Sequence, residues 1–509
     1  MTDHSANTHR IAKNTLLLYV RMFFLMILGL CASRVVLQAL GENDYGIYNV
    51  VGGVVAMFTV ISGALSTAIT RFITFEMGKG SFAQLNKVFS TAVNVQFIIC
   101  AIIILLAEPV GLWFIDNKMT IDPSRITAAR MVMHLSLLSF VVNLMSVPQM
   151  ASITAHEKMS AYAYIGLLDG SLRFASALAI SKAATDRLVL YAALMAASLI
   201  IVRCVYIIYC RARFPECRYR FIYDRSLVRQ MFSFAGWSFI GTASGVLRDQ
   251  GGNILINIFF GTTVNAARGL AVQLNGAVQS FITNFMTAVN PQITKSYASG
   301  DHAYMFSLMR KSSRMSFYLL LILALPILFN TEQIMSVWLK DVPAYSVVFV
   351  RLFLIFTLAE SISQPLITSM LATGRIRNYQ IIVGGLQLLN LPVSYVCLKM
   401  GAAPESTVVV AIVISQICLA ARLVMLERMI GLSVREFIIR VYLNVLAVAS
   451  VATILPLGIS LFTPDNILWT LMSISFTALS AVLSVLYVGC TADERRELWG
   501  FIRNRLGGK

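Results

Sequence analysis

Residues 14–76 read NTLLLYVRMFFLMILGLCASRVVLQALGENDYGIYNVVGGVVAMFTVISGALSTAITRFITFE. The short polar turn GENDYG joins two apolar runs, each longer than the roughly 20 residues that cross a bilayer as a helix. The first run contains Arg21 and Arg34, and the second contains Arg71. A charge at bilayer depth costs about 2.5–3.5 kcal/mol on insertion scales, so these arginines are expected to face water or protein. The stretch therefore predicts a helical hairpin with one apolar side and one cationic side.

The composition of the whole chain agrees with a membrane protein. Hydrophobic residues make up 58% of the 509 residues, whereas soluble proteins have about 45–50%. The apolar runs are continuous rather than alternating, which favours helices over a β-barrel. The formal net charge of +17 is concentrated in short loops between the apolar runs. This distribution is typical of cytoplasmic loops and argues against nucleic acid as a partner.

The apolar runs predict an all-α fold with about fourteen transmembrane helices. An even number of spans places both termini on one side of the membrane. Lys and Arg predominate in the loops on that side, which predicts cytoplasmic termini. The expected spans are 14–40, 46–75, 88–107, 128–150, 162–181, 188–209, 231–260, 263–293, 314–332, 345–372, 379–399, 405–427, 437–459 and 466–489.

Short motifs for metal binding or nucleotide hydrolysis are not found in the sequence. The eight cysteines are scattered without a CxxC pair or a Cys/His cluster, so we expect neither a disulfide framework nor a metal site. No GxxxxGK[ST] loop occurs, so we do not expect the chain to hydrolyse ATP. We accordingly predict no cofactor.

An internal repeat relates the two halves of the chain. Gly261 follows Gly41, and Gly300 follows Gly80, by 220 residues in each case. Farther along, PLITSMLATGRIRNY at 365–379 follows PQMASITAHEKMSAY at 148–162 by 217 residues. Each copy contains six spans, so both copies insert in the same orientation. Parallel repeats predict two six-helix lobes around a central cavity, related by an axis along the membrane normal.

The repeat also defines the expected domains. Residues 1–210 are expected to form the first six-helix lobe, and residues 231–430 the second. The basic segment 211–230 is predicted to connect the lobes on the cytoplasmic side. Residues 431–509 fall outside the repeat and are expected to contain two additional transmembrane helices and a basic cytoplasmic tail.

Polar residues within the expected spans are the candidates for a binding site. Arg248 and Asp249 lie near the middle of the seventh span, and because they are adjacent we expect them to have different partners. The eighth span is also rich in amides and hydroxyls, among them Gln279, Thr283 and Asn290. These groups favour a hydrated cavity for sugar hydroxyls, although amides also hydrogen-bond between membrane helices. The predicted cavity residues are Arg21, Arg34, Arg71, Arg248, Asp249, Asn253, Asn257, Arg268 and Gln273.

Two carboxylates are weaker candidates for coupling to protons or sodium ions. Glu360 is the isolated acid of the tenth span, and isolated carboxylates within a membrane often bind protons or cations. Asp169 is the second candidate, although its spacing from Arg173 favours a structural ion pair on one helix face. Arg422 is interpreted as an anchor at the membrane interface. Pro148 and Pro365 fall within spans and predict bends.

The opening segment at 14–53, NTLLLYVRMFFLMILGLCASRVVLQALGENDYGIYNVVGG, and FFGTTVNAARGLAVQLNGAVQSFITNFMTAVNPQITKSYASGD at 259–301 carry a resemblance to a known family. The chain resembles bacterial polysaccharide biosynthesis membrane proteins, the Wzx-type flippases for O-antigen or capsule repeat units. This family belongs to the multidrug/oligosaccharidyl-lipid/polysaccharide (MOP) exporter superfamily, which also contains multidrug-and-toxin extrusion carriers and lipid II flippases. In lipid II flippases, cavity arginines lie on spans one, two and eight. Arg21, Arg71 and Arg268 occupy the same spans here.

The resemblance implies transport of an undecaprenyl-pyrophosphate-linked oligosaccharide across the bacterial inner membrane, with no enzymatic step. Arginines would hold the anionic head group, and the lipid tail would stay in the bilayer. The implied partners are this lipid-linked substrate, the bilayer, a proton or sodium ion, and the polysaccharide polymerase machinery. One alternative is a cation-coupled multidrug or metabolite exporter of the same superfamily. A membrane polysaccharide polymerase is a weaker alternative, because such enzymes usually have a large periplasmic loop.

Overall fold

The computed structural model describes residues 2–56, 59–117, 122–222, 224–338, 342–460, 467–492 and 494–496. These residues form helices and connecting turns and contain no β-strand. Ten of the described helical segments are long and apolar enough to cross a membrane, and a bent pair raises the number to eleven. The three other expected spans, 46–75, 231–260 and 263–293, lie on helical segments outside this apolar set. The protein is thus an all-α, multi-pass membrane protein.

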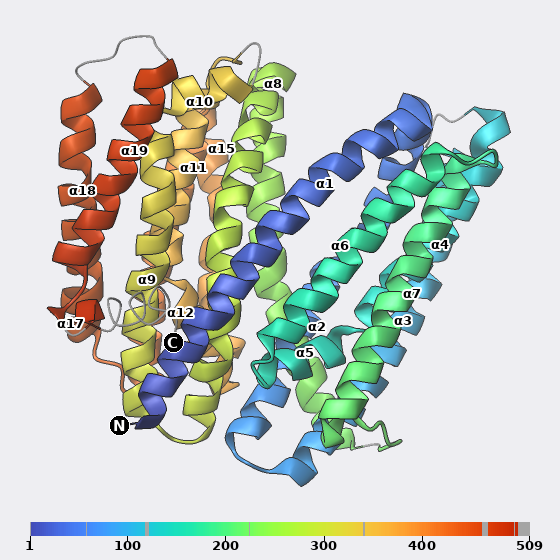
Figure 1. Ribbon diagram of the computed structural model, residues 1–509, viewed down its shortest axis with the longest axis horizontal. Helices are drawn as coiled ribbons and strands as arrows, with labels where there is room; N and C mark the ends of the chain where they lie inside the picture. The colour runs from blue at the N-terminus through green and yellow to red at the C-terminus, as the bar shows by residue number, and fades with distance from the viewer. Residues whose placement is uncertain are drawn as a thin grey trace, which may run out of the picture. The chain divides into compact units, whose positions relative to one another are not determined.

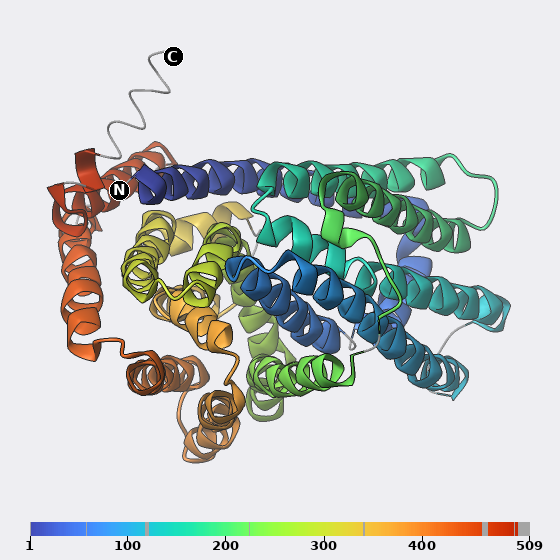
Figure 2. The same cartoon turned by 90° about the horizontal axis from the view of Figure 1, so that it is seen from below.

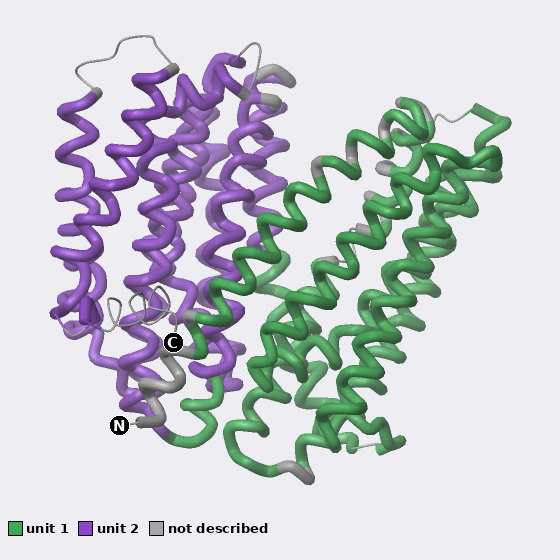
Figure 3. The backbone as a smooth tube through the Cα atoms, viewed as in Figure 1, with its two compact units in different colours: residues 1–243, 294–300 green, residues 244–293, 301–509 purple. Residues whose placement is uncertain are grey.

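The chain forms two compact units, which Figure 3 shows in different colours. Unit 1 comprises residues 1–243 and 294–300, and unit 2 comprises residues 244–293 and 301–509. The helices of unit 1 are α1 (Thr2–Ala56), α2 (Thr59–Gly78), α3 (Phe82–Asn117), α4 (Ile126–Leu144), α5 (Val147–Ala155), α6 (Met159–Ser181) and α7 (Arg187–Arg213), with 3-10 turns η1 (Pro123–Arg125) and η2 (Pro215–Cys217).

Helix α8 (Arg225–Ala298) begins and ends in unit 1, but most of its length belongs to unit 2. The remaining helices of unit 2 are α9 (His302–Phe329), α10 (Thr331–Trp338), α11 (Ser346–Ser361), α12 (Gln364–Thr373), α13 (Arg377–Tyr379), α14 (Gly385–Leu388), α15 (Asn390–Lys399), α16 (Ser406–Ile430), α17 (Val434–Phe437), α18 (Asn444–Ser460) and α19 (Ile467–Ser484). Three π-helical turns accompany them: η3 (Gln380–Gly384), η4 (Ile438–Leu443) and η5 (Val485–Gly489).

Packing within unit 1 depends on small residues where helices meet. Helix α1 lies beside α6, as both Figure 1 and Figure 2 show. Their contact includes the buried residues Val36, Ala177 and Ile180. Ala177 is fully buried and has only a methyl side chain, so it allows the two helices to approach closely.

The two C-terminal helices of unit 2, α18 and α19, pack on each other and on α9 (Figure 1). A polar contact also fixes this arrangement. The buried Tyr318 hydroxyl on α9 is hydrogen-bonded to Asn444 at the start of α18 and lies 3.1 Å from the carbonyl oxygen of Gly489. These contacts attach the C-terminal pair to the rest of unit 2.

Glycines with positive φ interrupt both long helices. Gly41 in α1 has φ +77° and ψ 170°, and Gly261 in α8 has φ +79° and ψ −171°. Gly80 and Gly300, which begin the next connections, have φ of +72° and +79°. Side chains disfavour this left-handed region, so glycine is the residue that permits each break. The same conformation therefore recurs at both glycine pairs of the sequence repeat.

The expected proline bends are also present. Pro148 occupies the first turn of α5, which follows the end of α4 by two residues. Pro365 occupies the first turn of α12, and α11 and α12 are bent by 42° at their junction. Proline lacks the amide hydrogen that would continue the preceding helix, but it fits the first turn of the next one.

Candidate functional site

Arg268 is the most buried of the predicted cavity arginines, with 5% of its surface exposed. It lies on α8 beyond the Gly261 break and contacts the helical segment before it. Its guanidinium donates to the side-chain oxygen of Asn253 and, at 3.3 Å, to the backbone oxygen of Asp249. Gly252 makes room for this contact, because a Cβ there would lie 2.6 Å from an Arg268 nitrogen. The Arg268 Nε is buried and has no hydrogen-bond partner in the described structure.

Arg248 and Asp249 bond to each other, so the expectation that they have different partners was wrong. The Arg248 Nε donates to the Asp249 carboxylate at 2.9 Å. The arginine side chain is long enough to reach the neighbouring carboxylate although the two Cβ atoms point in different directions. Its guanidinium also lies over the Phe356 ring, 5.0 Å from the centroid. Arg248, Asp249, Asn253 and Arg268 thus form one cluster with two guanidinium groups and one carboxylate.

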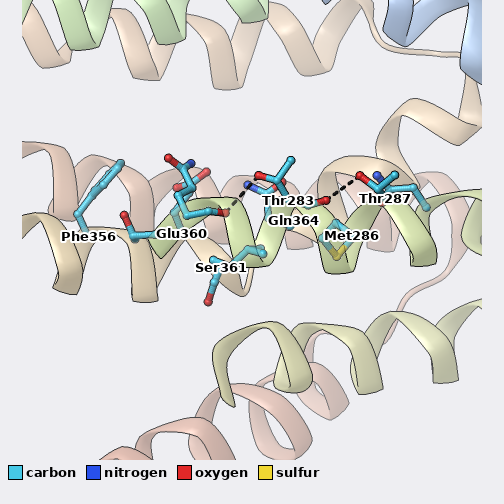
Figure 4. Close-up of a pocket in the computed structure, with 11 residues that line it drawn as sticks. Thr283, Met286, Thr287, Phe356, Glu360, Ser361 and Gln364 are labelled. Atoms are coloured by element: carbon cyan, nitrogen blue, oxygen red, sulfur yellow. Dashed lines mark hydrogen bonds between the residues drawn. The ribbon is translucent and has the colours of Figure 1, made fainter. Parts of the chain in front are cut away.

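A cavity of about 220 Å³ lies within unit 2, between the second half of α8 and helices α11 and α12 (Figure 4). Amides, hydroxyls and one carboxylate, Glu360, supply most of its polar lining, and Phe356 connects it to Arg248. Its lining residues are Gln279, Ile282, Thr283, Met286, Thr287, Asn290, Phe356, Thr357, Glu360, Ser361 and Gln364. The four-residue spacing of Gln279, Thr283 and Thr287 places them on one face of α8. Such a lining offers hydrogen-bond donors and acceptors to a polyhydroxylated molecule.

Glu360 is not isolated, which corrects the prediction from sequence. One of its carboxylate oxygens lies 3.7 Å from an Arg422 nitrogen on α16. Arg422 is also not an interface anchor, because its side chain is 1% exposed and lies inside unit 2. The reason is that α16 packs against α11, so that a polar residue far from either helix end faces a neighbouring helix. The Nε and Nη1 groups of Arg422 have no hydrogen-bond partner among the described residues.

Two of the three candidate arginines of unit 1 contact aromatic rings. Arg21 on α1 lies over the Tyr162 ring of α6, 4.6 Å from its centroid. Gly166, one turn farther along α6, leaves space for the guanidinium, because a Cβ there would collide with it. Arg71 on α2 lies 4.3 Å from the centroid of the Phe75 ring. Guanidinium groups on aromatic faces keep their charge at modest cost, because the ring quadrupole attracts a cation.

The other candidates are placed differently. Arg34, Asn257 and Gln273 are exposed, and none of them forms a hydrogen bond to another described residue. The structure therefore does not bring them into the Arg268 cluster. Asp169 accepts a hydrogen bond from Arg173 at 3.0 Å, which confirms the predicted ion pair one turn apart on α6.

Sequence reasoning identified one wall of the cavity but missed the other. The amides and hydroxyls of α8 were evident as a polar pattern in an apolar span. The opposite wall consists of Thr357, Ser361 and Gln364 beside Glu360. Their spacing of three or four residues, TLAESISQ, was the available signal. This pattern is divided between two helices, because the chain bends between α11 and α12 just before Pro365.

Comparisons with known proteins give one family match. The family model described as "Polysaccharide biosynthesis protein" matches residues 11–297, which is more than half of the chain. Among curated protein sequences, none matches this chain.

Solved structures show the same fold at low sequence identity. A multidrug resistance MATE family transporter of the MOP superfamily in an outward-facing conformation has a TM-score of 0.74 and 11% identity, with 84% of this chain and 97% of that chain covered. A MATE protein in complex with MaD3S has a TM-score of 0.73 and 11% identity, with coverage of 83% and 97%. A MOP superfamily transporter from Pyrococcus furiosus has a TM-score of 0.70 and 10% identity, with coverage of 82% and 96%. The chain therefore has the MATE fold.

Proposed function

Because this chain belongs to the polysaccharide biosynthesis protein family, we propose that it is a flippase for lipid-linked oligosaccharides. Its substrate would be an undecaprenyl-pyrophosphate-linked repeat unit for O-antigen, capsule or exopolysaccharide synthesis. The chain moves this unit across the bacterial inner membrane by alternating access, without a catalytic step. The observation that carries the proposal is the excess of guanidinium charge in the Arg268 cluster beside a polar cavity whose one carboxylate, Glu360, is paired with Arg422.

The Arg268 cluster suits the anionic part of such a substrate. Arg248 pairs with the carboxylate of Asp249, whereas Arg268 contacts only the backbone oxygen of Asp249, so the cluster holds two guanidinium charges and one carboxylate charge. A pyrophosphate is strongly anionic, and guanidinium groups bind phosphate oxygens with paired, planar donors. The unpartnered Arg268 Nε is a donor that a phosphate oxygen can satisfy. Arg21 and Arg71 would add cationic contacts in unit 1.

The cavity beside α11 and α12 suits the sugars. Its amides and hydroxyls both donate and accept hydrogen bonds, as sugar hydroxyl groups do. Phe356 lies at one end of the cavity and beneath Arg248, which supports a binding site where sugar and phosphate groups of one substrate are held next to each other in unit 2. Because membrane flippases move only the polar head, the lipid tail remains in the bilayer throughout.

The proposal includes a location and a topology. The protein resides in the inner membrane with both termini in the cytoplasm, as the loop charges indicate. Residues 1–210 and 231–430 act as the two lobes of the transport cycle, with 431–509 as an appended pair of helices. The polymerase machinery that consumes the flipped repeat unit is the proposed neighbour on the opposite side of the membrane.

The test is extraction of lipids from a strain that lacks the gene, combined with an assay of surface glycan. We expect undecaprenyl-pyrophosphate oligosaccharide to accumulate, with its sugars accessible only from the cytoplasmic leaflet, and surface glycan to be lost. The mass of the accumulated lipid gives the sugar composition. Unchanged intermediates and intact glycan in a strain without a second flippase would contradict the proposal.

Glu360 favours a second candidate, a cation-coupled exporter of drugs or metabolites. A carboxylate that lines a cavity is a suitable cation ligand. Two observations weigh against this function: Arg422 already neutralises Glu360, and the Arg268 cluster carries excess positive charge. Ethidium efflux in an efflux-deficient strain separates the two, because only the exporter reduces ethidium accumulation.

A further inference from the structure

The segment after η2 is bound to helix α3 by a regular series of hydrogen bonds. We name residues 218–222 the strap. The Asn86 side chain donates to the backbone oxygen of Arg218 at 2.8 Å, Ser90 accepts from the backbone nitrogen of Arg220 at 3.2 Å, and Asn94 donates to the backbone oxygen of Ile222 at 2.9 Å. The Tyr219 hydroxyl also donates to Asn94 at 2.8 Å.

The spacing of these contacts shows how the strap runs. Asn86, Ser90 and Asn94 follow each other by four residues, so they lie on one face of α3 and span about 12 Å at 1.5 Å per residue. Residues 218–222 in an extended conformation span about 13 Å, which matches this length. The strap therefore runs alongside the first turns of α3 in the same direction as the helix.

This direction places the strap at the edge of the membrane. The apolar part of α3 that can cross a bilayer begins at Gln84, so Ser90 and Asn94 are already within it. The strap also follows the spanning helix α7, which ends at Arg213. Phe221 is 82% exposed and Tyr219 is 40% exposed. Exposed aromatic rings at this depth are typical of the boundary between head groups and acyl chains.

The acidic groups near the strap are already paired, whereas its arginines are not. Glu216 is buried and bonded to His156, and Asp224 lies 2.6 Å from Lys87. The exposed arginines have no ion-pair partner among the described residues. They are Arg211, Arg213, Arg218, Arg220, Arg225 and Arg229. Positive charge beside exposed aromatic rings is complementary to a surface of anionic lipid.

We propose that the strap is a binding surface for anionic phospholipid head groups, with Arg218 and Arg220 contacting phosphate and Phe221 entering the acyl boundary. This inference does not rest on the proposed transport function. The hydrogen bonds to α3 hold the backbone of the strap, so little conformational entropy is lost when lipid binds. The surface thereby anchors the segment that precedes α8.

The experiment uses the purified full chain in mixed micelles of phosphatidylglycerol and phosphatidylethanolamine, with the retained lipids counted by native mass spectrometry. We expect R218Q/R220Q to weaken retention of phosphatidylglycerol about twentyfold and to leave phosphatidylethanolamine unchanged. F221A is expected to lower retention of both lipids. The control K182Q/K399Q removes the same charge from exposed lysines elsewhere and should retain lipid like the wild type. An unchanged melting temperature shows that each variant is folded.

Three results would overturn the proposal. One is equal retention of phosphatidylglycerol by R218Q/R220Q and the control. Another is displacement of the lipid by millimolar inorganic phosphate, which would identify a site for the free anion. The third is a finding that the wild type binds a polyprenyl pyrophosphate more tightly than phosphatidylglycerol and that R218Q/R220Q no longer binds it. That result would assign the strap to a transported substrate instead of the bilayer.

Discussion

Gly78 and Ala298, which are 220 residues apart at equivalent positions of the repeat, pack directly against each other. A Cβ on Gly78 would lie 2.7 Å from the Ala298 Cβ and 2.8 Å from the Lys295 backbone oxygen. Lys295 in turn forms an ion pair with Glu157 at 2.5 Å. The end of the second hairpin is thus attached to the end of the first. Glycine is required at position 78 for this close approach rather than for its backbone freedom.

We expect G78A to destabilise unit 1. Alanine normally stabilises a helix relative to glycine by about 0.5–1 kcal/mol, but here the added methyl group collides with a backbone oxygen. Overpacking of this kind costs about 1–3 kcal/mol. The measurement is thermal unfolding in detergent. G29A is the control, because a Cβ at Gly29 has no atom within 4 Å, and it should be neutral or stabilising. Equal melting temperatures for both variants would show that the Gly78 contact is loose.

Removal of a guanidinium from the Arg268 cluster should abolish transport without loss of protein. In R248A, the Asp249 carboxylate loses its partner and the cluster loses a phosphate ligand, so we expect at least a tenfold fall in glycan export. R203K is the control, because Arg203 makes only a 3.5 Å contact to a backbone oxygen in unit 1 and should tolerate lysine. Equal export by R248A and wild type at matched expression would remove Arg248 from the substrate site.

The arrangement of the chain was largely predictable from its sequence, and the partners of its charges were not. The apolar runs and the glycine pairs, such as Gly41 and Gly261, report local requirements of a membrane helix and of a helix break. By contrast, the contact of Glu360 with Arg422 depends on the packing of α16 against α11, which no local pattern encodes. The Arg248–Asp249 bond depended on a side-chain rotamer and was predicted wrongly for that reason.

The polar face of α3 illustrates a signal that was present but not used. Asn86, Ser90 and Asn94 repeat every four residues at the start of an apolar span. Such a pattern indicates a polar partner along one helix face, but it does not say which segment provides it. The partner is the backbone of the strap. Backbone hydrogen-bonding groups are the same in almost every residue type, so the sequence does not reveal which segment supplies them.

Removal of one partner of the Glu360–Arg422 pair should lower the stability of the protein much more than removal of both. R422M leaves the Glu360 carboxylate, whose side chain is 14% exposed, without its ion-pair partner, and removal of one partner of a buried pair costs up to about 3–5 kcal/mol. The double variant E360Q/R422M leaves neither charge and should recover most of that stability. A double-mutant cycle by thermal or urea unfolding gives the coupling energy. Additive effects of the two substitutions would mean that the pair contributes little.

The same cycle tests the basis of cation coupling. In the wild type Arg422 supplies the positive charge beside Glu360, so transport should not depend on sodium. In R422M, sodium or a proton should be needed to neutralise Glu360, and we expect the melting temperature to rise with sodium concentration. Sodium-dependent stability in the wild type that disappears in E360Q would instead show that Glu360 binds a cation despite Arg422.

The attachment of the segment between α7 and α8 should weaken in acid. Burial alone would raise the pKa of Glu216, but the hydrogen bond with His156, a backbone hydrogen bond and the charge interaction with His156 together outweigh it and lower the pKa below its ordinary value of 4.5. The hydrogen bond from Lys87 lowers the pKa of Asp224 below 3.8. Because both pKa values are lower in the folded state, the stabilisation is complete above the ordinary values and is lost as the pH falls through the folded ones.

Hydrogen exchange of the amides in 214–222 measures this loss directly. We expect protection to be constant from pH 7 to about pH 5, after correction for intrinsic exchange, and to fall below about pH 4. E216Q should remove part of the acid sensitivity and lower protection at neutral pH, because a neutral amide bonds more weakly to His156 than a carboxylate does. The control E332Q changes an exposed carboxylate of unit 2, 3.6 Å from Arg351, and should leave this profile unchanged. A wild-type profile that is flat down to pH 3 would mean that the Asn86, Ser90 and Asn94 contacts alone hold the segment.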